Sequence, residues 1–103
     1  MNLNEYQKAA MSFRMDSASA LYAIINLGGE VGELYSLLAK SIRDGAKEDF
    51  EEQVKKELGD VLWHVAAVAK DYGFTLDDIA ASNIAKLSSR KARNMISGSG
   101  DNR

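Results

Sequence analysis

The 103-residue sequence carries 13 lysines and arginines against 15 aspartates and glutamates, so its formal net charge at pH 7 is −2. This balance offers no basic surface for nucleic acid, and we expect no nucleic-acid partner. The chain has no cysteine, which excludes disulfides and zinc–thiolate sites, and no apolar run approaches the ~20 residues of a membrane span. Because the first residues are polar and lack a signal-peptide core, we expect a single cytoplasmic domain over residues 1–103 with no membrane partner.

The N-terminal half is expected to form two helices. Apolar residues at helical spacing predict a first helix over residues 3–14. Asp16 or Ser17 is the predicted N-cap of a second, long helix that runs to about residue 43. A turn follows, with Gly45 at the C-cap position. The sequence contains no proline, which favours long uninterrupted helices.

The C-terminal half is expected to form two more helices. The third covers about residues 47–72 and ends at Gly73. Thr75 is the predicted N-cap of the fourth, which runs to about residue 94, and Asp78 completes a start that resembles a capping box. The tail over residues 97–103 is glycine-rich and non-helical. No alternating strand pattern competes, so the predicted fold is all-α, with four helices of which two are long and central.

The second helix carries more apolar surface than one partner helix would cover. Its additional apolar residues, outside the main stripe, are Leu21, Ile25, Tyr35 and Ile42. Because only four helices are available, we expect this surface to lie at a subunit interface, most simply in a homodimer and otherwise in a homotetramer.

Two pairs of carboxylates stand out because they lie on the apolar stripes of the two long helices. Glu30 and Glu33 form the first pair, and Glu57 and Asp60 form the second. Packing of the two stripes would bring the four carboxylates together in a partly dry place, where they need a cation. Clustered oxygen ligands suit Mg²⁺, or Mn²⁺ or Ca²⁺, better than zinc.

The simpler alternative is that these carboxylates are solvated helix charges paired with lysines. It leaves the neighbouring glycines unexplained, since each costs a helix interior about 1 kcal/mol relative to alanine. Those glycines are Gly28, Gly29, Gly32 and Gly59. We expect them to allow a metal, a phosphate or another helix to approach closely. The only histidine, His64, lies one turn past Asp60 and is expected to be a partly buried structural residue.

The fourth helix places polar and basic side chains beside its apolar stripe. These are Asn83, Lys86 and Arg90, and Lys40 on the second helix has a comparable position. Long basic side chains often extend from such positions into solvent, and on this interpretation the residues have no binding role. The functional interpretation is that they bind phosphate oxygens.

The chain resembles the all-α nucleoside triphosphate pyrophosphohydrolases, and most closely their small MazG-like group. The resemblance rests on Glu30-x-x-Glu33 followed after 23 residues by Glu57-x-x-Asp60, and it extends over almost the whole chain. The other matching segments are Glu57-Leu58-Gly59-Asp60-Val61-Leu62-Trp63, Asn83-Ile84-Ala85-Lys86-Leu87 with Arg90, and the tail Gly98-Ser99-Gly100-Asp101-Asn102-Arg103. One departure is Arg90-Lys91-Ala92-Arg93-Asn94, where many relatives have an Arg-Tyr-Pro-like end.

The resemblance implies a four-helix, bundle-like MazG fold and the hydrolysis of a nucleoside triphosphate to a monophosphate and pyrophosphate, in a role of nucleotide-pool house-cleaning. It also implies Mg²⁺ bound by Glu30, Glu33, Glu57 and Asp60. The family's phosphate-contacting positions would be Lys40, Lys86 and Arg90, with Asn83 beside them.

Water attack at the α-phosphorus requires a general base, and Glu33 is our choice, although spacing does not separate it from Glu30 or Glu57. The alternative to an enzyme is a helical, oligomeric interaction module in which the acidic cluster holds a structural ion.

Overall fold

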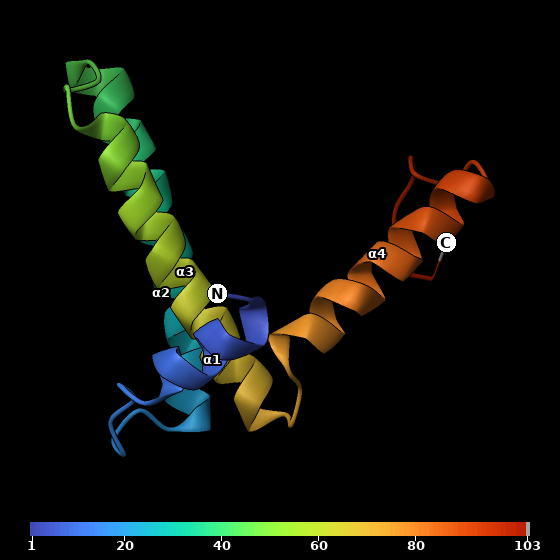
Figure 1. The fold of residues 1–103 in the computed structure, drawn as a ribbon. Coiled ribbons are helices and arrows are strands. Elements are labelled where there is room, and N and C mark those ends of the chain that lie inside the picture. Colours follow the sequence, from blue (N-terminus) through green and yellow to red (C-terminus); the bar gives the residue numbers. More distant parts are fainter. Residues whose placement is uncertain (103) are drawn as a thin grey trace.

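The computed structural model describes residues 1–102 and consists of four helices (Figure 1). They are α1 (Leu3–Met11), α2 (Ala20–Asp44), α3 (Phe50–Asp71) and α4 (Leu76–Ala92). No strand occurs within the described residues, so the predicted all-α fold with two long helices is confirmed. None of the helices in this part of the chain is both long and apolar enough to cross a bilayer.

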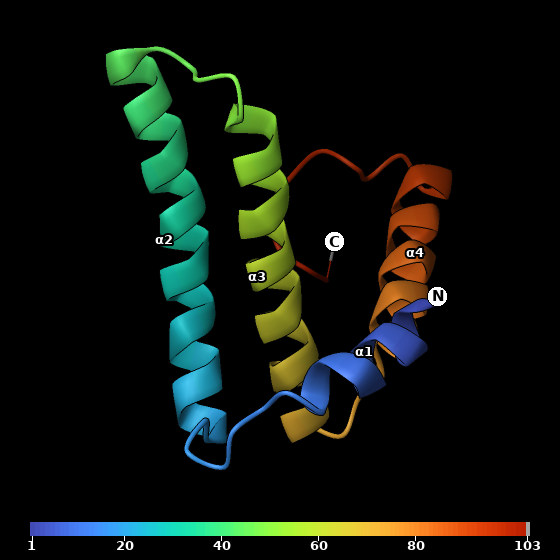
Figure 2. The same ribbon diagram turned by 60° about the vertical axis from the view of Figure 1, so that its left-hand side comes forward.

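The long helices α2 and α3 run antiparallel and side by side, as both views show (Figure 1, Figure 2). The turn between them begins at Gly45, whose φ of 85° suits a residue without a Cβ. Gly45 is the C-cap of α2, as predicted. A short connection over residues 45–49 therefore joins two helices that pack against each other.

The start of α2 differs from the prediction. The N-cap is Ser19, whose hydroxyl accepts from the Tyr22 backbone N–H at 3.2 Å, and the predicted caps Asp16 and Ser17 lie in the preceding turn. The Arg14 side chain explains the shift, because its Nε donates to the Ala18 carbonyl oxygen at 2.9 Å and holds the chain in that turn. The Arg14 guanidinium is itself held by Asp71 of α3, with Arg14 Nη1 2.8 Å from Asp71 Oδ1, so a distant contact contributes to where the helix begins.

Two other helices are shorter than predicted, α1 at its C-terminal end and α3 at its N-terminal end. After Met11 the chain continues to Arg14 in single turns that link backbone N–H groups to carbonyls three residues back, so regular α-helix stops before residue 14. Helix α3 begins at Phe50 and not at about residue 47. At its other end, Gly73 and Phe74 donate to the Lys70 and Ala69 carbonyls and form a Schellman-type cap.

The core lies where α1 crosses the lower end of the α2–α3 hairpin (Figure 2). It is built from small residues of α2 and α3 together with α1 and the start of α4: Ala10, Met11, Ala23, Ala66, Ala67, Ala69 and Leu76. Within the described residues no large side chain is fully buried. A single copy therefore leaves much of the apolar surface of its long helices uncovered.

The buried Gln7 of α1 holds the corner between α3 and α4. Its Nε2 donates to the carbonyl oxygens of Ala66 and Phe74 at 3.2 and 3.1 Å. Its Oε1 accepts from the Leu76 N–H at 3.0 Å, the first N–H of α4. The predicted cap Thr75 accepts from the Asp78 N–H at 3.1 Å, which confirms that part of the sequence interpretation.

Helix α4 leaves this corner and stands apart from α2 and α3 in both views (Figure 1, Figure 2). Its packing partner in the chain is mainly α1. The tail after α4 folds back along the same helix, where Arg90 Nη2 donates to the Asp101 carbonyl oxygen at 2.7 Å. Helix α4 and the tail thus form an arm anchored at the Gln7 corner.

Candidate metal centre

Three of the four predicted carboxylates converge between α2 and α3. Glu30 comes from α2, and Glu57 and Asp60 come from α3. One carboxylate oxygen of each lies within 4.8 Å of the others. Glu30 and Glu57 are half-buried and Asp60 is exposed, so the group opens to solvent on one side.

Glu33, the fourth carboxylate, lies outside this convergent group and is exposed. Its charge still acts on the site. The pKa of Glu57 is raised, first by desolvation and then by the negative charges of Asp60, Glu33 and Glu30. The four carboxylates therefore share one negative field, in which three are close enough to ligate a common ion and the fourth faces solvent.

The donor set fits a divalent cation with a preference for oxygen ligands. Ligand oxygens at the Mg²⁺ distance of about 2.1 Å lie at most about 4.2 Å apart, and Ca²⁺ tolerates about 5 Å. The separations of up to 4.8 Å therefore need only a small side-chain closure to hold Mg²⁺ or Mn²⁺. No cysteine or second histidine is available to favour zinc.

The glycines beside the carboxylates do not make room within a single chain. A Cβ placed on Gly28, Gly32 or Gly59 meets nothing within 4 Å. Only Gly29 faces a side chain, because a Cβ there would lie 3.1 Å from Asn26 Oδ1. The expected close helix approach is therefore not present inside the chain at three of the four positions.

His64 is buried, and it joins α3 to α2 beside the metal centre. Its Nδ1 lies 2.9 Å from the Asp60 carbonyl oxygen, and its Nε2 lies 3.0 Å from the Asn26 amide nitrogen. Sequence interpretation missed Asn26. Its position one turn before Glu30 on the same helix face is the signal that would have found it.

The predicted phosphate-binding residues of α4 are not near the carboxylates within one chain, because α4 stands apart from the hairpin (Figure 2). Lys86 Nζ lies 3.1 Å from Asp101 Oδ1. Arg90 is only 4% exposed and binds the tail through Asp101. Asn83 is exposed and lines a hollow with Lys86 and Phe74.

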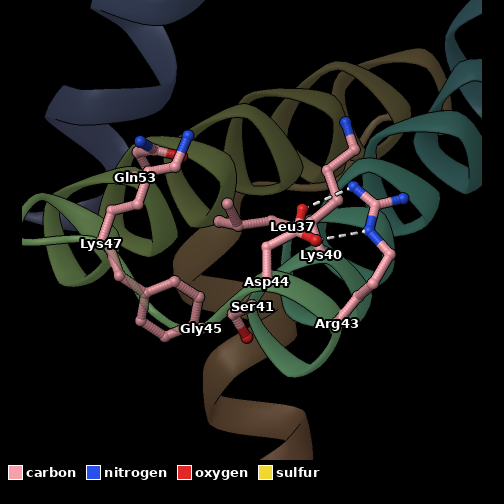
Figure 3. A pocket seen from close by; sticks show the side chains of 9 residues that line it. Leu37, Lys40, Ser41, Arg43, Asp44, Gly45, Lys47 and Gln53 are labelled. Atoms are coloured by element: carbon pink, nitrogen blue, oxygen red, sulfur yellow. Dashed lines mark hydrogen bonds and ion pairs between the residues drawn. The ribbon is translucent and has the colours of Figure 1, made fainter.

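Lys40 lies at the far end of the hairpin, in a hollow at the α2–α3 turn (Figure 3). The hollow also contains Lys47 and the ion pair between Arg43 and Asp44, with Arg43 Nη2 2.7 Å from an Asp44 oxygen. Lys40 is two turns past Glu33, about 10 Å along the helix axis. This hollow presents positive charge, and the group of possible metal ligands found among the described residues lies elsewhere, at Glu30, Glu57 and Asp60.

Comparison with known proteins identifies the fold that carries this centre. Residues 19–94, which include all four carboxylates, match the MazG nucleotide pyrophosphohydrolase domain. The chain belongs to the MazG family. The MazG chain is also 36% identical to Gene 37 protein of Mycobacterium phage L5, over an alignment of 114 residues that spans the whole of both proteins. No solved structure matches it.

Membership in this family indicates what kind of substrate and metal the acidic cluster is suited to. MazG domains are generally nucleoside triphosphate pyrophosphohydrolases and typically use a divalent metal. The match covers α2, α3 and α4, which hold every residue singled out for the site. The domain therefore has a nucleotide as its expected substrate and a candidate metal centre where the two long helices face each other.

Proposed function

We propose that this MazG domain hydrolyses nucleoside triphosphates, including deoxynucleoside triphosphates, to the monophosphate and pyrophosphate in a Mg²⁺-dependent reaction. The observation that carries the proposal is the convergence of Glu30, Glu57 and Asp60 between α2 and α3. A divalent ion bound there would polarise phosphate oxygens and neutralise developing negative charge. The role that follows is removal of unwanted triphosphates from the nucleotide pool.

The protein groups have separable tasks in this proposal. Glu30, Glu57 and Asp60 hold the ion, and Glu33, which faces solvent beside them, takes the proton of the attacking water. The water oxygen bonds to the α-phosphorus while the bond from that phosphorus to the pyrophosphate oxygen breaks.

We propose that three basic residues and the Asn83 amide bind the substrate phosphates, with Arg90 acting indirectly through the tail. Lys40 approaches from the α2–α3 turn, and Asn83, Lys86 and Arg90 come from α4. On Lys86 a substrate phosphate would exchange with the Asp101 carboxylate that now pairs with it. Arg90 would act through the tail that it holds.

We further propose that the active form is a homodimer or a homotetramer. Supporting this, large apolar side chains of α2 are more than half exposed in the single chain: Leu21, Tyr22, Ile25, Tyr35, Leu38 and Ile42. Exposed apolar residues of this number on one helix are typical of an interface between subunits. In this assembly we propose that the α4 arm of a second copy reaches the metal centre, because the chain's own α4 packs mainly on α1.

The test is the identity of the products. The protein is incubated with each of the canonical and several modified nucleoside triphosphates and Mg²⁺ in ¹⁸O-labelled water, and the products are separated. We expect monophosphate and pyrophosphate in equal amounts, with the label in the monophosphate. Orthophosphate with a diphosphate would contradict cleavage at the α-phosphorus. The absence of turnover with every nucleotide would favour a helical interaction module with a structural ion.

A further inference from the structure

The tail after α4 returns to the helix at two basic residues (Figure 1). Lys86 and Arg90 are one turn apart on α4, so their side chains leave the same face of the helix. Asp101 of the tail contacts both, because its Oδ1 lies 3.1 Å from Lys86 Nζ and 3.4 Å from Arg90 Nη2. One carboxylate therefore lies between two cations, as a phosphate oxygen bound to the same pair would.

The tail is held in two ways that differ in exposure to water. Arg90 is 4% exposed, and its Nη2 donates to the backbone carbonyl oxygens of Asp101 at 2.7 Å and Gly100 at 3.4 Å. The ion pair between the side chains of Asp101 and Lys86 is open, because these side chains are 82% and 37% exposed. An ion pair in such contact with water is weak and exchanges readily. The Asp101 carboxylate can therefore leave Lys86 while Arg90 retains the backbone of the tail.

The closed position of the tail is shaped by glycine and leaves one donor unsatisfied. Gly98 and Gly100 have φ values of 118° and 86°, which allow the chain to bend back onto α4 just before Asp101. Arg90 Nε is buried and has no hydrogen-bond partner within the described residues. A buried donor without a partner disfavours the arrangement that contains it. The closed tail is thus well formed but is not a fully satisfied end state.

Lys86 also lines the hollow on the face of α4 that contains Asn83 and Phe74. A phosphate group that enters this hollow meets the Lys86 ammonium and, one turn away, the Asn83 amide. It cannot share Lys86 with Asp101 without bringing two negative charges close together, which is unfavourable. Binding of a phosphate at Lys86 and closure of Asp101 onto Lys86 therefore compete.

We propose that Asp101 is an internal competitor that occupies Lys86 in the free protein and leaves it when a pyrophosphate group binds, while Arg90 keeps the tail attached. The proposal rests on the proposed function for its ligand, since the triphosphate substrate contains this group and the reaction releases it. The apparent affinity of Lys86 for phosphate is reduced to the fraction of time in which Asp101 is away. A fivefold reduction corresponds to a tail that is closed about four-fifths of the time.

Calorimetric titration of the full-length protein with inorganic pyrophosphate tests the competition. EDTA is present, so that no ion at the carboxylates contributes to binding. We expect Asp101→Asn to bind pyrophosphate at least about fivefold more tightly than the parent. The control is Asp77→Asn, which makes the same change of charge at an exposed residue of α4 about 13 Å along the helix from Lys86, and its affinity should stay within about twofold of the parent's. Asp101→Asn with equal or weaker affinity than the parent, or with the same gain as the control, would overturn the proposal.

The carboxylate ¹³C signal of Asp101 in NMR spectra reports the exchange itself. Hydrogen bonds from Lys86 and Arg90 lower the pKa of Asp101 below 3.8, so the group is ionised at pH 7 and a shift of its signal reports a change of partner. Pyrophosphate should move this signal in the parent toward its position in Lys86→Met, where the partner is missing. The carboxylate signal of Asp77 should not move. An Asp101 signal unmoved by pyrophosphate at tens of millimolar would overturn the proposal, because the tail would then remain on Lys86.

Hydrolysis kinetics connect the competition to the reaction. We expect Asp101→Asn to lower KM for a deoxynucleoside triphosphate at least about threefold, because the substrate no longer displaces a carboxylate from Lys86. A raised KM would show that Asp101 positions Lys86 for substrate and would overturn the proposal. If the parent releases no pyrophosphate from any nucleotide, the proposed function fails. The calorimetric titration and the Asp101 signal need no turnover, so they still decide whether the tail competes with a pyrophosphate group.

Discussion

Replacement of Gln7 by methionine is expected to destabilise the protein strongly while it keeps the side-chain volume. Gln7 is 8% exposed and makes three hydrogen bonds to backbone groups near the α3–α4 corner. Each such bond contributes about 1 kcal/mol, and the Leu76 N–H would lose its partner, so the loss is about 2–4 kcal/mol. For a domain of this size that corresponds to a fall in Tm of roughly 8–30 °C.

Thermal unfolding followed by circular dichroism, with urea unfolding for the free energy, measures this loss. Gln53→Met is the matched control, because Gln53 is half-buried on α3 and donates only to the Asp49 side chain in a single exposed bond. It should change the free energy of unfolding by no more than about 0.5 kcal/mol. A Gln7→Met protein as stable as this control would refute the claim that Gln7 fixes the corner and the direction of α4.

Three further outcomes are expected. In EDTA, Asp60→Asn should melt at the same temperature as the parent or higher, because it removes one of several negative charges that lie close together. Added Mg²⁺ should raise the Tm of the parent and raise the Tm of the variant much less. A parent melting curve that does not move at tens of millimolar Mg²⁺ would contradict the metal centre. Hydrogen bonds from Arg14 at 2.8 and 2.9 Å lower the pKa of Asp71 below its ordinary value of 3.8, so their stabilisation is present above that pH and is lost as the pH falls through the lowered pKa. Accordingly, Asp71→Asn should cost about 1–2 kcal/mol in urea unfolding at pH 7 and progressively less below pH 3.8, whereas a cost independent of pH would exclude the ion pair as its source. Light scattering at micromolar concentration should give at least twice the chain mass of 11.3 kDa, and an active monomer would argue against the subunit interface.

Features that depend on neighbouring residues could be predicted from the sequence. The Thr75 cap and the Gly45 turn are local, because the groups that pair lie within a few residues of each other. The meeting of Glu30 with Glu57 and Asp60 also follows from helix periodicity, once two long helices are joined by a short turn.

Features that depend on distant residues could not be predicted in this way. The start of α2 at Ser19 depends on Arg14, whose guanidinium is held by Asp71 at the far end of α3. The direction of α4 depends on Gln7, and the partner of Arg90 is in the tail. No helical period encodes such contacts, because each joins elements whose relative placement is set only by tertiary packing.

The central claim is that pyrophosphate release depends on the carboxylates between α2 and α3. The most direct measurement compares the rate of Mg²⁺-dependent pyrophosphate release from a deoxynucleoside triphosphate by Asp60→Asn and by the control Glu51→Gln, whose exposed carboxylate lies in the first turn of α3 outside the cluster. We predict that Asp60→Asn loses activity by at least about 100-fold with helical content intact, and that Glu51→Gln retains the parent rate. Equal rates for the two variants would contradict the assignment of the active site to this centre.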